Sequence, residues 1–183
     1  WKQINKFVEV LDHALDATPL ARAERIDVVD FGSGKGYLTF ATHDHLRRTR
    51  HLAAEVTGVE LREDMVTLCN TAARGLALDG LHFEQGDVRS VVPPQIDIMI
   101  ALHACDTATD HAIHTGIRAG ATIIMCSPCC HKQLRPQLLQ PHPLRPLLKH
   151  GVHLGQQAEM VTDGLRALLL EPCGYETQVF EFV

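Results

Sequence analysis

The stretch VVDFGSGKGYL, residues 28–38, says most about the fold. It begins as a short apolar run and continues into three glycines that alternate with a serine and a lysine. This order is typical of a buried strand that enters a tight turn and then a helix, here from Tyr37 to about His51. Glycines let the backbone approach a ligand closely, and the first amides of the helix point toward it. The stretch therefore predicts a ligand-binding loop at the end of a strand.

Strands and helices alternate on both sides of this loop. An amphipathic helix precedes it, and further apolar segments predict strands at 54–60, 81–87, 96–105 and 121–126, with helices at 62–78 and 106–120. Regular alternation predicts one α/β domain over residues 1–183, with a Rossmann-like, mostly parallel twisted sheet and helices on both faces.

The C-terminal third follows a different pattern. Residues 135–151 carry four prolines and predict short, interrupted helices, and residues 158–171 predict a longer helix. Residues 174–183 alternate between polar and apolar side chains with an imperfect phase. We predict a sixth and last strand there.

The composition is that of a soluble globular protein, with 45% hydrophobic and 21% charged residues among 183. No apolar run is long enough to span a membrane, and the polar start lacks the features of a secretory signal. The first residue is Trp1 rather than Met, so we expect a piece of a longer protein. With no sign of secretion, we expect the six cysteines to be reduced and the location to be cytoplasmic.

The net charge of −5 is unevenly distributed. Residues 111–158 contain no Asp or Glu, but they contain five basic residues: Arg118, Lys132, Arg135, Arg145 and Lys149. Such a segment suits an anionic partner, and it equally suits an ordinary solvated face. Both interpretations stay open.

Three carboxylates lie at the ends of predicted strands. Glu60 closes the second strand, where a carboxylate can accept both hydroxyls of a ribose, and Asp87 follows the third, where it can accept an adenine amine while the Val88 amide serves a ring nitrogen. Asp30 can hold the loop or receive an ammonium group. Open α/β sheets bind ligands at these strand ends. Each acid alone would be an ordinary surface carboxylate, but the three occur in an order that suits a nucleoside.

The glycine spacing separates this loop from two common nucleotide loops. It is G-x-G-x-G, whereas dinucleotide-binding loops have G-x-G-x-x-G and Walker loops have a longer spacing before the lysine. An NAD-dependent oxidoreductase is therefore a weaker alternative than a binder of another adenosine cofactor.

The run from Asp30 to Gly36, with Glu60 and Asp87, resembles class I S-adenosylmethionine-dependent methyltransferases. The stretches ALHACDTATD (101–110) and CCHKQLR (129–135) resemble the methyltransferase domain shared by little-characterised bacterial proteins and eukaryotic methyltransferase-like proteins. They are also similar to certain tRNA 2′-O-methyltransferases with Cys-Cys-His at the comparable place. The resemblance covers residues 2–183 and implies a seven-stranded family sheet, so with six predicted strands we expect the last family strand to be missing.

The resemblance implies S-adenosyl-L-methionine as the cofactor. We assign its site to the glycine loop and the strand ends: Asp30, Gly32, Ser33, Gly34, Gly36, Glu60, Leu61, Asp87, Val88, Leu102 and His103. We also expect the first helix to cover the methionine end through Lys2, Gln3 or Lys6.

The segments LHACD (102–106) and CSPCCHK (126–132) follow the fourth and fifth predicted strands. Adjacent parallel strands lie about 5 Å apart, so these segments should flank one acceptor pocket. His103 or His131 suits a general base, although His103 equally suits packing beneath the cofactor. Asp106 suits orientation of the base or the acceptor, and equally the cap of the following helix.

The cysteines allow four interpretations. A Cys129–Cys130 disulfide would be strained, and a zinc site would lack two separated C-x-x-C pairs. A nucleophilic role for Cys105, Cys129 or Cys130 matches the placement in RNA cytosine-C5 methyltransferases, but the flanking motifs differ. We favour a close-packed turn shaped by Pro128, without a metal. The catalytic candidates are then His103, Cys105, Asp106, Cys129, Cys130 and His131.

Lys132 and Arg135 are expected to face the acceptor. RNA is the first acceptor class, because the basic segment suits phosphates, and protein is the second. A non-catalytic S-adenosylmethionine-binding module is the remaining alternative.

Overall fold

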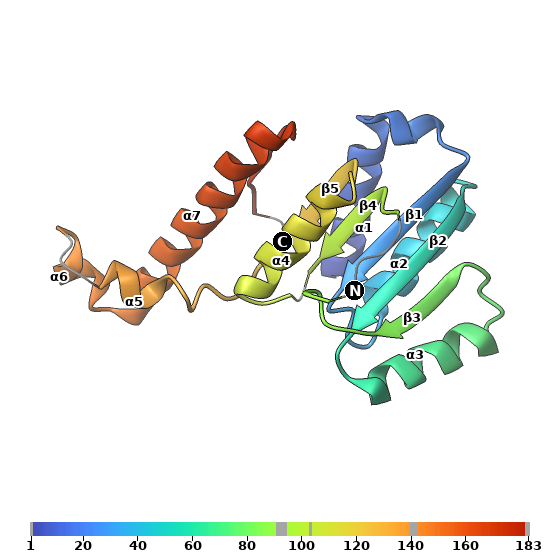
Figure 1. Ribbon diagram of the computed structural model, residues 1–183, viewed down its shortest axis with the longest axis horizontal. Coiled ribbons are helices and arrows are strands. Elements are labelled where there is room, and N and C mark those ends of the chain that lie inside the picture. Colours follow the sequence, from blue (N-terminus) through green and yellow to red (C-terminus); the bar gives the residue numbers. More distant parts are fainter. Residues whose placement is uncertain (1, 91–94, 103, 140–142, 182–183) are drawn as a thin grey trace.

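The computed structural model describes residues 2–90, 95–102, 104–139 and 143–181. A five-stranded, all-parallel sheet of order β3-β2-β1-β4-β5 forms the centre of this part of the chain (Figure 1). Its strands are β1 (Arg25–Phe31), β2 (Ala53–Glu60), β3 (Leu81–Gln85), β4 (Ile98–Ala101) and β5 (Ile123–Cys126). The chain extends the sheet outward from β1 to β3 and then returns to the other side of β1 with β4. That reversal creates a switch point at the carboxyl ends of β1 and β4, where open α/β sheets bind ligands.

Helices cover both faces of the sheet (Figure 1). The helices are α1 (Lys2–Asp16), α2 (Tyr37–Asp44), α3 (Glu63–Gly75), α4 (Thr107–Arg118), α5 (Arg135–Leu138), α6 (Arg145–Leu148) and α7 (Gly151–Leu170). Shorter turns are η1 (Pro19–Arg22), η2 (His45–Thr49) and η3 (Glu171–Cys173). The first three helices share one apolar core with one face of the sheet, and α4 packs on the opposite face.

The two cores follow from the alternation of side chains along β1. Ile26 and Val28 belong to the core that contains Leu11 of α1, whereas Val29 and Phe31 belong to the core on the α4 face. Successive side chains of a strand point to opposite faces, so a strand covered on both faces is mostly apolar. The apolar runs of β1 and β4 are therefore buried on both sides, whereas β3, at the edge of the sheet, buries Leu81 and Phe83 and exposes the residues between and after them.

The sequence located all five observed strands, but the predicted sixth strand (174–183) is wrong for its described residues 174–181, and residues 182 and 183 lie outside the described part. Residues 175–181 have no regular structure, and Val179 and Phe180 are 66% and 53% exposed. These two apolar residues are adjacent, so a strand would send them to opposite faces and could not bury both on one side. The segment is held instead by the Tyr175 hydroxyl, which donates a hydrogen bond to the Ala121 carbonyl at 2.7 Å.

Two helix boundaries also differ from prediction. The helix after the glycine loop ends at Asp44, and the chain continues to Thr49 as a π-helical turn. The last helix begins at Gly151, seven residues earlier than predicted, because glycine lowers helix propensity without preventing a helix.

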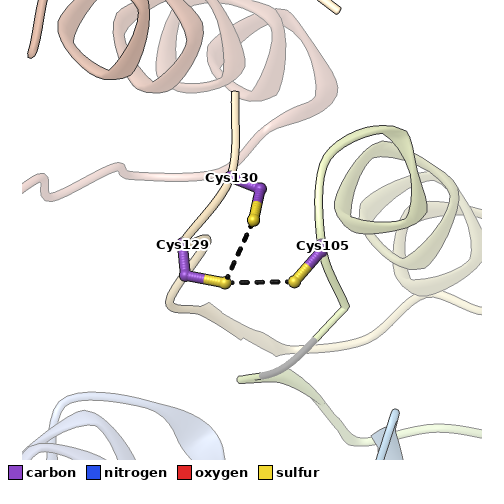
Figure 2. Close-up of side chains that lie close together, drawn as sticks. All are labelled: Cys105, Cys129 and Cys130. Atoms are coloured by element: carbon purple, nitrogen blue, oxygen red, sulfur yellow. Dashed lines mark hydrogen bonds between the residues drawn. The ribbon is translucent and has the colours of Figure 1, made fainter. Parts of the chain in front are cut away.

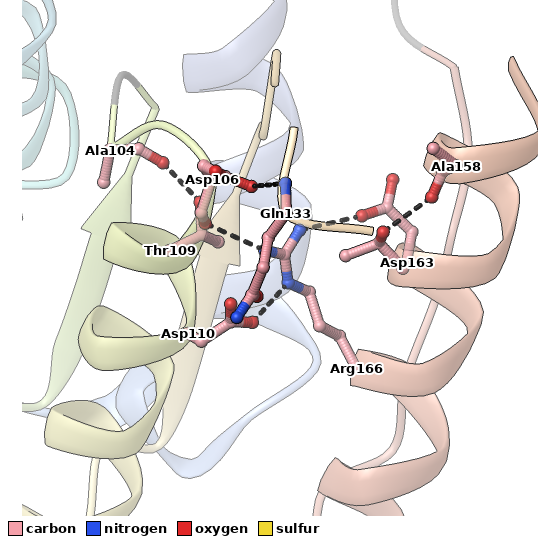
Figure 3. Close-up of polar contacts among 9 residues, drawn as sticks. Ala104, Asp106, Thr109, Asp110, Gln133, Ala158, Asp163 and Arg166 are labelled. Carbon is pink, nitrogen blue, oxygen red and sulfur yellow. Dashed lines mark hydrogen bonds and ion pairs between the residues drawn. The ribbon is translucent and has the colours of Figure 1, made fainter. Parts of the chain in front are cut away.

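Helices α5, α6 and α7 lie to one side of the sheet (Figure 1). Arg166 of α7 connects them to α4: its Nε donates to Asp110 Oδ1 at 2.8 Å and its Nη2 to the Asp106 carbonyl at 3.1 Å (Figure 3). A third bond, from Nη1 to Asp163 at 3.1 Å, orients the guanidinium from its own helix. A largely buried arginine thus joins the two helices.

Within the described ranges, no helix combines the length and apolar character needed to cross a bilayer.

Candidate active site

The glycine loop is held against the end of β2. The amides of Gly32 and Ser33 both donate to the Val59 carbonyl, at 2.8 and 3.2 Å. Gly32, Gly34 and Gly36 have φ angles of +75°, +57° and +72°, in the left-handed region that favours glycine. A Cβ on Gly36 would also lie 2.8 Å from the Phe83 ring. The loop therefore needs its glycines for its shape.

Glu60 fixes the loop from the neighbouring strand. Its Oε2 accepts the Gly34 amide at 2.9 Å, and its Oε1 accepts the Arg62 amide at 3.1 Å. Each carboxylate oxygen has two lone pairs, so the group keeps acceptor capacity beyond these two bonds. Glu60 thus supports the loop and remains able to accept further hydrogen bonds.

Asp30 is a buried carboxyl group directly before the glycines. It is 2% exposed, and its Oδ2 accepts the Thr39 hydroxyl at 2.7 Å. Burial raises the pKa of Asp30 to about 7, and the Thr39 bond opposes only part of this rise. An unpaired charge is costly in an apolar environment, so a nearby cation would favour ionisation of Asp30.

Asp87 follows β3 and is paired with Arg89. The Arg89 side chain donates to both carboxylate oxygens through Nε, at 2.9 and 3.0 Å, and to Oδ2 through Nη2, while the Arg89 amide donates at 2.9 Å. The Arg89 guanidinium and amide hold the pKa of Asp87 well below its usual range. Asp87 is therefore ionised at neutral pH.

One cavity of about 830 Å³ lies at these strand ends. Nine of the predicted cofactor residues line it: Asp30, Gly32, Ser33, Gly34, Glu60, Leu61, Asp87, Val88 and Leu102. Gly36 belongs to the loop but does not line the cavity, and His103 lies outside the described residues. The structure thus brings the predicted set together, and its role in binding stays a prediction.

The first helix contributes one of the three residues proposed for the methionine end. Gln3 lines the cavity, together with Ile4. Lys2 and Lys6 are not among the lining residues, and Lys6 pairs with Glu9 at 2.7 Å. Gln3 is therefore the residue of the three that the fold places at the cavity.

Several cavity residues were missed at the sequence level. Thr107 and His111 line the cavity from the first turns of α4, and Tyr37 lines it from the start of α2. Thr107 and His111 are four residues apart, a spacing that puts both on one face of a helix. This spacing, directly after the LHACD segment, is the sequence feature that could have identified Thr107 and His111 as cavity residues.

Three predicted catalytic cysteines form a cluster outside the glycine loop (Figure 2). The Sγ atom of Cys129 lies 3.0 Å from that of Cys105 and 3.6 Å from that of Cys130. All six cysteines are free thiols, and Cys105 also lines the cavity. Hydrogen bonding to Cys129 raises the pKa of Cys105 to about 12. Because a nucleophilic cysteine needs a thiolate, this raised pKa does not favour Cys105 as the nucleophile.

Asp106 connects the two loops that carry the cysteines. It occupies the N-cap position of α4, but its side chain makes no capping bond. Its Oδ1 accepts the amide of Gln133 at 3.2 Å (Figure 3), and its φ is +55°. The side chain therefore joins the two loops and does not serve as a helix cap.

The remaining predicted residues do not line the cavity. His131 is 4% exposed, and neither ring nitrogen has a hydrogen-bond partner in the described part of the chain. Lys132 is exposed, and the Arg135 guanidinium lies toward Gly155 of α7. The cavity and the cysteine cluster thus share Cys105, while these three residues lie elsewhere.

A protein family described as a methyltransferase domain matches residues 1–137. The chain belongs to this family. The predicted S-adenosylmethionine-dependent methyltransferase domain is thereby confirmed, without identifying the acceptor.

The relatives of this methyltransferase domain are longer proteins. Two proteins named "Glutathione S-transferase C-terminal domain-containing protein", from Homo sapiens and Macaca fascicularis, are each 26% identical over 202 residues. The match covers 97% of the chain and 30% of each relative. The chain therefore spans less than a third of the length of these curated relatives.

Two solved structures are similar to part of the chain. A putative class I S-adenosylmethionine-dependent methyltransferase from Listeria monocytogenes has a TM-score of 0.50 at 11% identity, over 63% of this chain and 42% of that one. A methyltransferase from Geobacter sulfurreducens, solved with S-adenosyl-L-homocysteine, has a TM-score of 0.45 at 19% identity, over 61% and 42%. The five-stranded parallel sheet of the methyltransferase domain is thus a Rossmann-like sheet.

Proposed function

We propose that the chain binds S-adenosylmethionine in the 830 Å³ cavity and transfers its methyl group to a macromolecular acceptor, with RNA as the acceptor class. The observation that carries the proposal is the convergence of the glycine loop, Asp30, Glu60 and Asp87 on one cavity in a methyltransferase-family chain. The cavity lies within the roughly 300–1,000 Å³ typical of small-molecule sites.

The cavity residues fit the parts of this cofactor. Glu60 keeps acceptor capacity for ribose hydroxyls, and ionised Asp87 with the Val88 amide suits the adenine edge. Ser33 Oγ is buried and has no hydrogen-bond partner among the described residues, so it is available to a ligand. Polar groups that are buried without a partner are costly, and a bound ligand would satisfy this one.

Asp30 suits the ammonium group of the cofactor. A cation beside this buried carboxyl would stabilise its ionised form and lower its pKa from about 7. Binding near neutral pH would then release a proton from Asp30, which gives the assignment a measurable consequence.

When bound, the cofactor would supply a methyl group on a positively charged sulfur: a lone pair of the acceptor would bond to the methyl carbon in line as the carbon–sulfur bond breaks, and S-adenosylhomocysteine would leave. The chain must align the acceptor and remove its proton. Cys105, Thr107 and His111 line the same cavity from the start of α4 and its preceding loop. His111 is the histidine that the described residues place there, and an imidazole can take a proton near neutral pH.

The basic segment supports RNA as the acceptor. Arg118, Lys132, Arg145 and Lys149 are exposed, and residues 111–158 contain no acidic side chain. Exposed cations without acidic neighbours in sequence suit contacts with phosphates, which weaken as salt rises. The resemblance of Cys129-Cys130-His131 to the Cys-Cys-His of certain tRNA 2′-O-methyltransferases supports the same class.

Calorimetry tests the cofactor. We expect S-adenosylmethionine to bind and NADH not to bind; the reverse result would favour an oxidoreductase. Glu60→Gln should weaken binding by about tenfold or more, because a carboxylate hydrogen bond contributes about 1.5–3 kcal/mol. Glu63→Gln is the matched control, since Glu63 is exposed on α3 and outside the cavity.

Methyl-labelled S-adenosylmethionine and cell extract test the acceptor. We expect label that nuclease removes and protease does not, and less labelling as salt rises. Label that protease alone removes would replace RNA by protein as the acceptor class. Cofactor binding without transfer to any extract fraction would support the non-catalytic module.

A further inference from the structure

The cysteine cluster consists of Cys105, Cys129 and Cys130, which come from two loops. Cys105 lies between β4 and α4, and the other two follow β5 (Figure 2). The three Sγ atoms all lie within 4.8 Å of one another. In Figure 2 the three side chains converge on the space between the loops. This arrangement brings soft ligands together at one point.

We propose that the cysteine cluster binds one zinc ion through three thiolates and leaves a fourth position for an exogenous ligand. Zinc binds thiolates at about 2.3 Å in tetrahedral geometry, which places ligand sulfurs about 3.8 Å apart. The Cys129–Cys130 separation of 3.6 Å already matches, and the Cys105–Cys129 separation of 3.0 Å needs to widen by less than about 1 Å. Coordination replaces three thiol protons with one divalent cation.

The spacing of the cysteines along the sequence does not indicate a zinc site. The fold, however, brings together cysteines that are far apart in the sequence. Two separated C-x-x-C pairs are absent, but β4 and β5 pair in parallel, with Ala101 opposite Cys126. Their carboxyl ends therefore lie side by side, and Cys105 joins Cys129 across 24 residues. Three converging thiols are a better ligand set than the local CSPCC motif alone.

Other contacts hold the two loops together independently of a metal. Asp106, directly after Cys105, accepts the amide of Gln133, three residues after Cys130 (Figure 3). Asp106 adopts φ +55° and ψ −126°, a conformation that non-glycine residues keep only when surrounding structure enforces it. The Thr109 hydroxyl donates to the Ala104 carbonyl and fixes the other side of Cys105. The ligand positions are thus largely preorganised.

The exposure of the cluster favours an open fourth position. Cys105 and Cys129 are exposed, Cys130 is half-buried, and Cys105 also lines the cavity. Structural zinc sites are closed by four protein ligands, whereas sites with three protein ligands leave room for water or a substrate atom. The cluster would place a divalent cation beside the cavity. Zinc binding by the three thiols is independent of the identity of the cofactor and the acceptor.

Metal analysis of the purified chain tests the proposal. The chain is reduced, stripped with a chelator, loaded with zinc and dialysed against metal-free buffer. We expect one zinc per chain by elemental analysis, and cobalt loading should produce the visible and charge-transfer absorption of tetrahedral thiolate coordination. A wild-type chain that retains no zinc would overturn the site, as would a Cys105–Cys129 disulfide that persists under reductant.

Single substitutions assign the ligands. Cys105→Ser, Cys129→Ser and Cys130→Ser should each weaken zinc binding by about 100-fold or more, since even outer-shell partners contribute about 10- to 100-fold. Cys173→Ser is the matched control, because Cys173 is exposed and outside the cluster. Circular dichroism checks that each variant is folded. Equal zinc retention by the cluster variants and the control would overturn the assignment of the three ligands. If one variant misfolds, the zinc content of the wild-type chain still tests whether the site exists.

Discussion

Asp30→Asn isolates the buried carboxyl of the glycine loop. Asparagine has nearly the same size and keeps an oxygen that can accept the Thr39 hydroxyl, but it cannot ionise. In the wild type, burial raises the pKa of Asp30 from its ordinary value of 3.8 to about 7 in the folded protein. The two proteins should therefore differ mainly in how stability depends on pH.

Whether stability rises or falls with pH depends on which state, folded or unfolded, binds more protons. Between pH 3.8 and about 7 the unfolded wild type loses the Asp30 proton while the folded protein keeps it. Because the folded state then binds more protons, its free energy of unfolding falls as pH rises through this window and levels off above about 7. The full difference is about 4 kcal/mol at about 1.36 kcal/mol per pKa unit, of which roughly 2–3 kcal/mol lies between pH 5 and 8. The free energy of unfolding of Asp30→Asn should not show this decrease with pH, because asparagine does not ionise.

Urea unfolding of both proteins at several pH values measures the effect. We expect the stability of Asp30→Asn relative to wild type to increase steadily from pH 5 to 7 and then to stay constant. Calorimetry in buffers of different ionisation enthalpy should show proton release when S-adenosylmethionine binds wild type near pH 7, and none with Asp30→Asn. The variant should also bind more weakly above pH 7, where wild-type Asp30 is ionised.

Parallel stability curves for the two proteins between pH 5 and 8 would contradict a raised pKa for Asp30. Such a result would mean that Asp30 ionises in the folded state with an ordinary pKa. If wild-type stability instead rose with pH, and Asp30→Asn abolished the rise, the pKa of Asp30 would be lowered in the folded state and the prediction would be wrong.

Two further substitutions test the fold around the site. Gly58→Ala should destabilise by about 1–3 kcal/mol in urea unfolding, because its Cβ would overlap the Phe83 ring beneath the glycine loop. Gly75→Ala, where a Cβ meets nothing within 4 Å, should be neutral or stabilising, and equal effects of the two would contradict the packing. Arg166→Met should increase hydrogen exchange in α7 by removing its bonds to α4, whereas exposed Arg118→Met should leave α7 protected.

The glycine loop and the strand ends were predictable because their determinants are local. Three glycines after an apolar run indicate a turn with positive φ, and the structure has all three in the left-handed region. Glu60 is the last residue of β2 and Asp87 comes two residues after the end of β3, so the parallel sheet brings both to the same edge.

The sixth strand failed for a non-local reason. Alternation in residues 174–183 suggested a strand, but a strand also needs a neighbouring edge to pair with and a face to bury. Residues 175–181 pair with no strand in the structure, and the tail is held through the Tyr175 hydroxyl.

The α/β class, the glycine loop and the order of the carboxylates along the strands follow from the amino-acid sequence alone. Tertiary structure was needed to show that Cys105 meets Cys129, that His111 joins the cavity and that Arg166 of α7 contacts α4. The physical reason is distance along the chain. Turn chemistry and hydrophobic period act between near neighbours, whereas these contacts depend on how strands pair and helices pack over tens of residues.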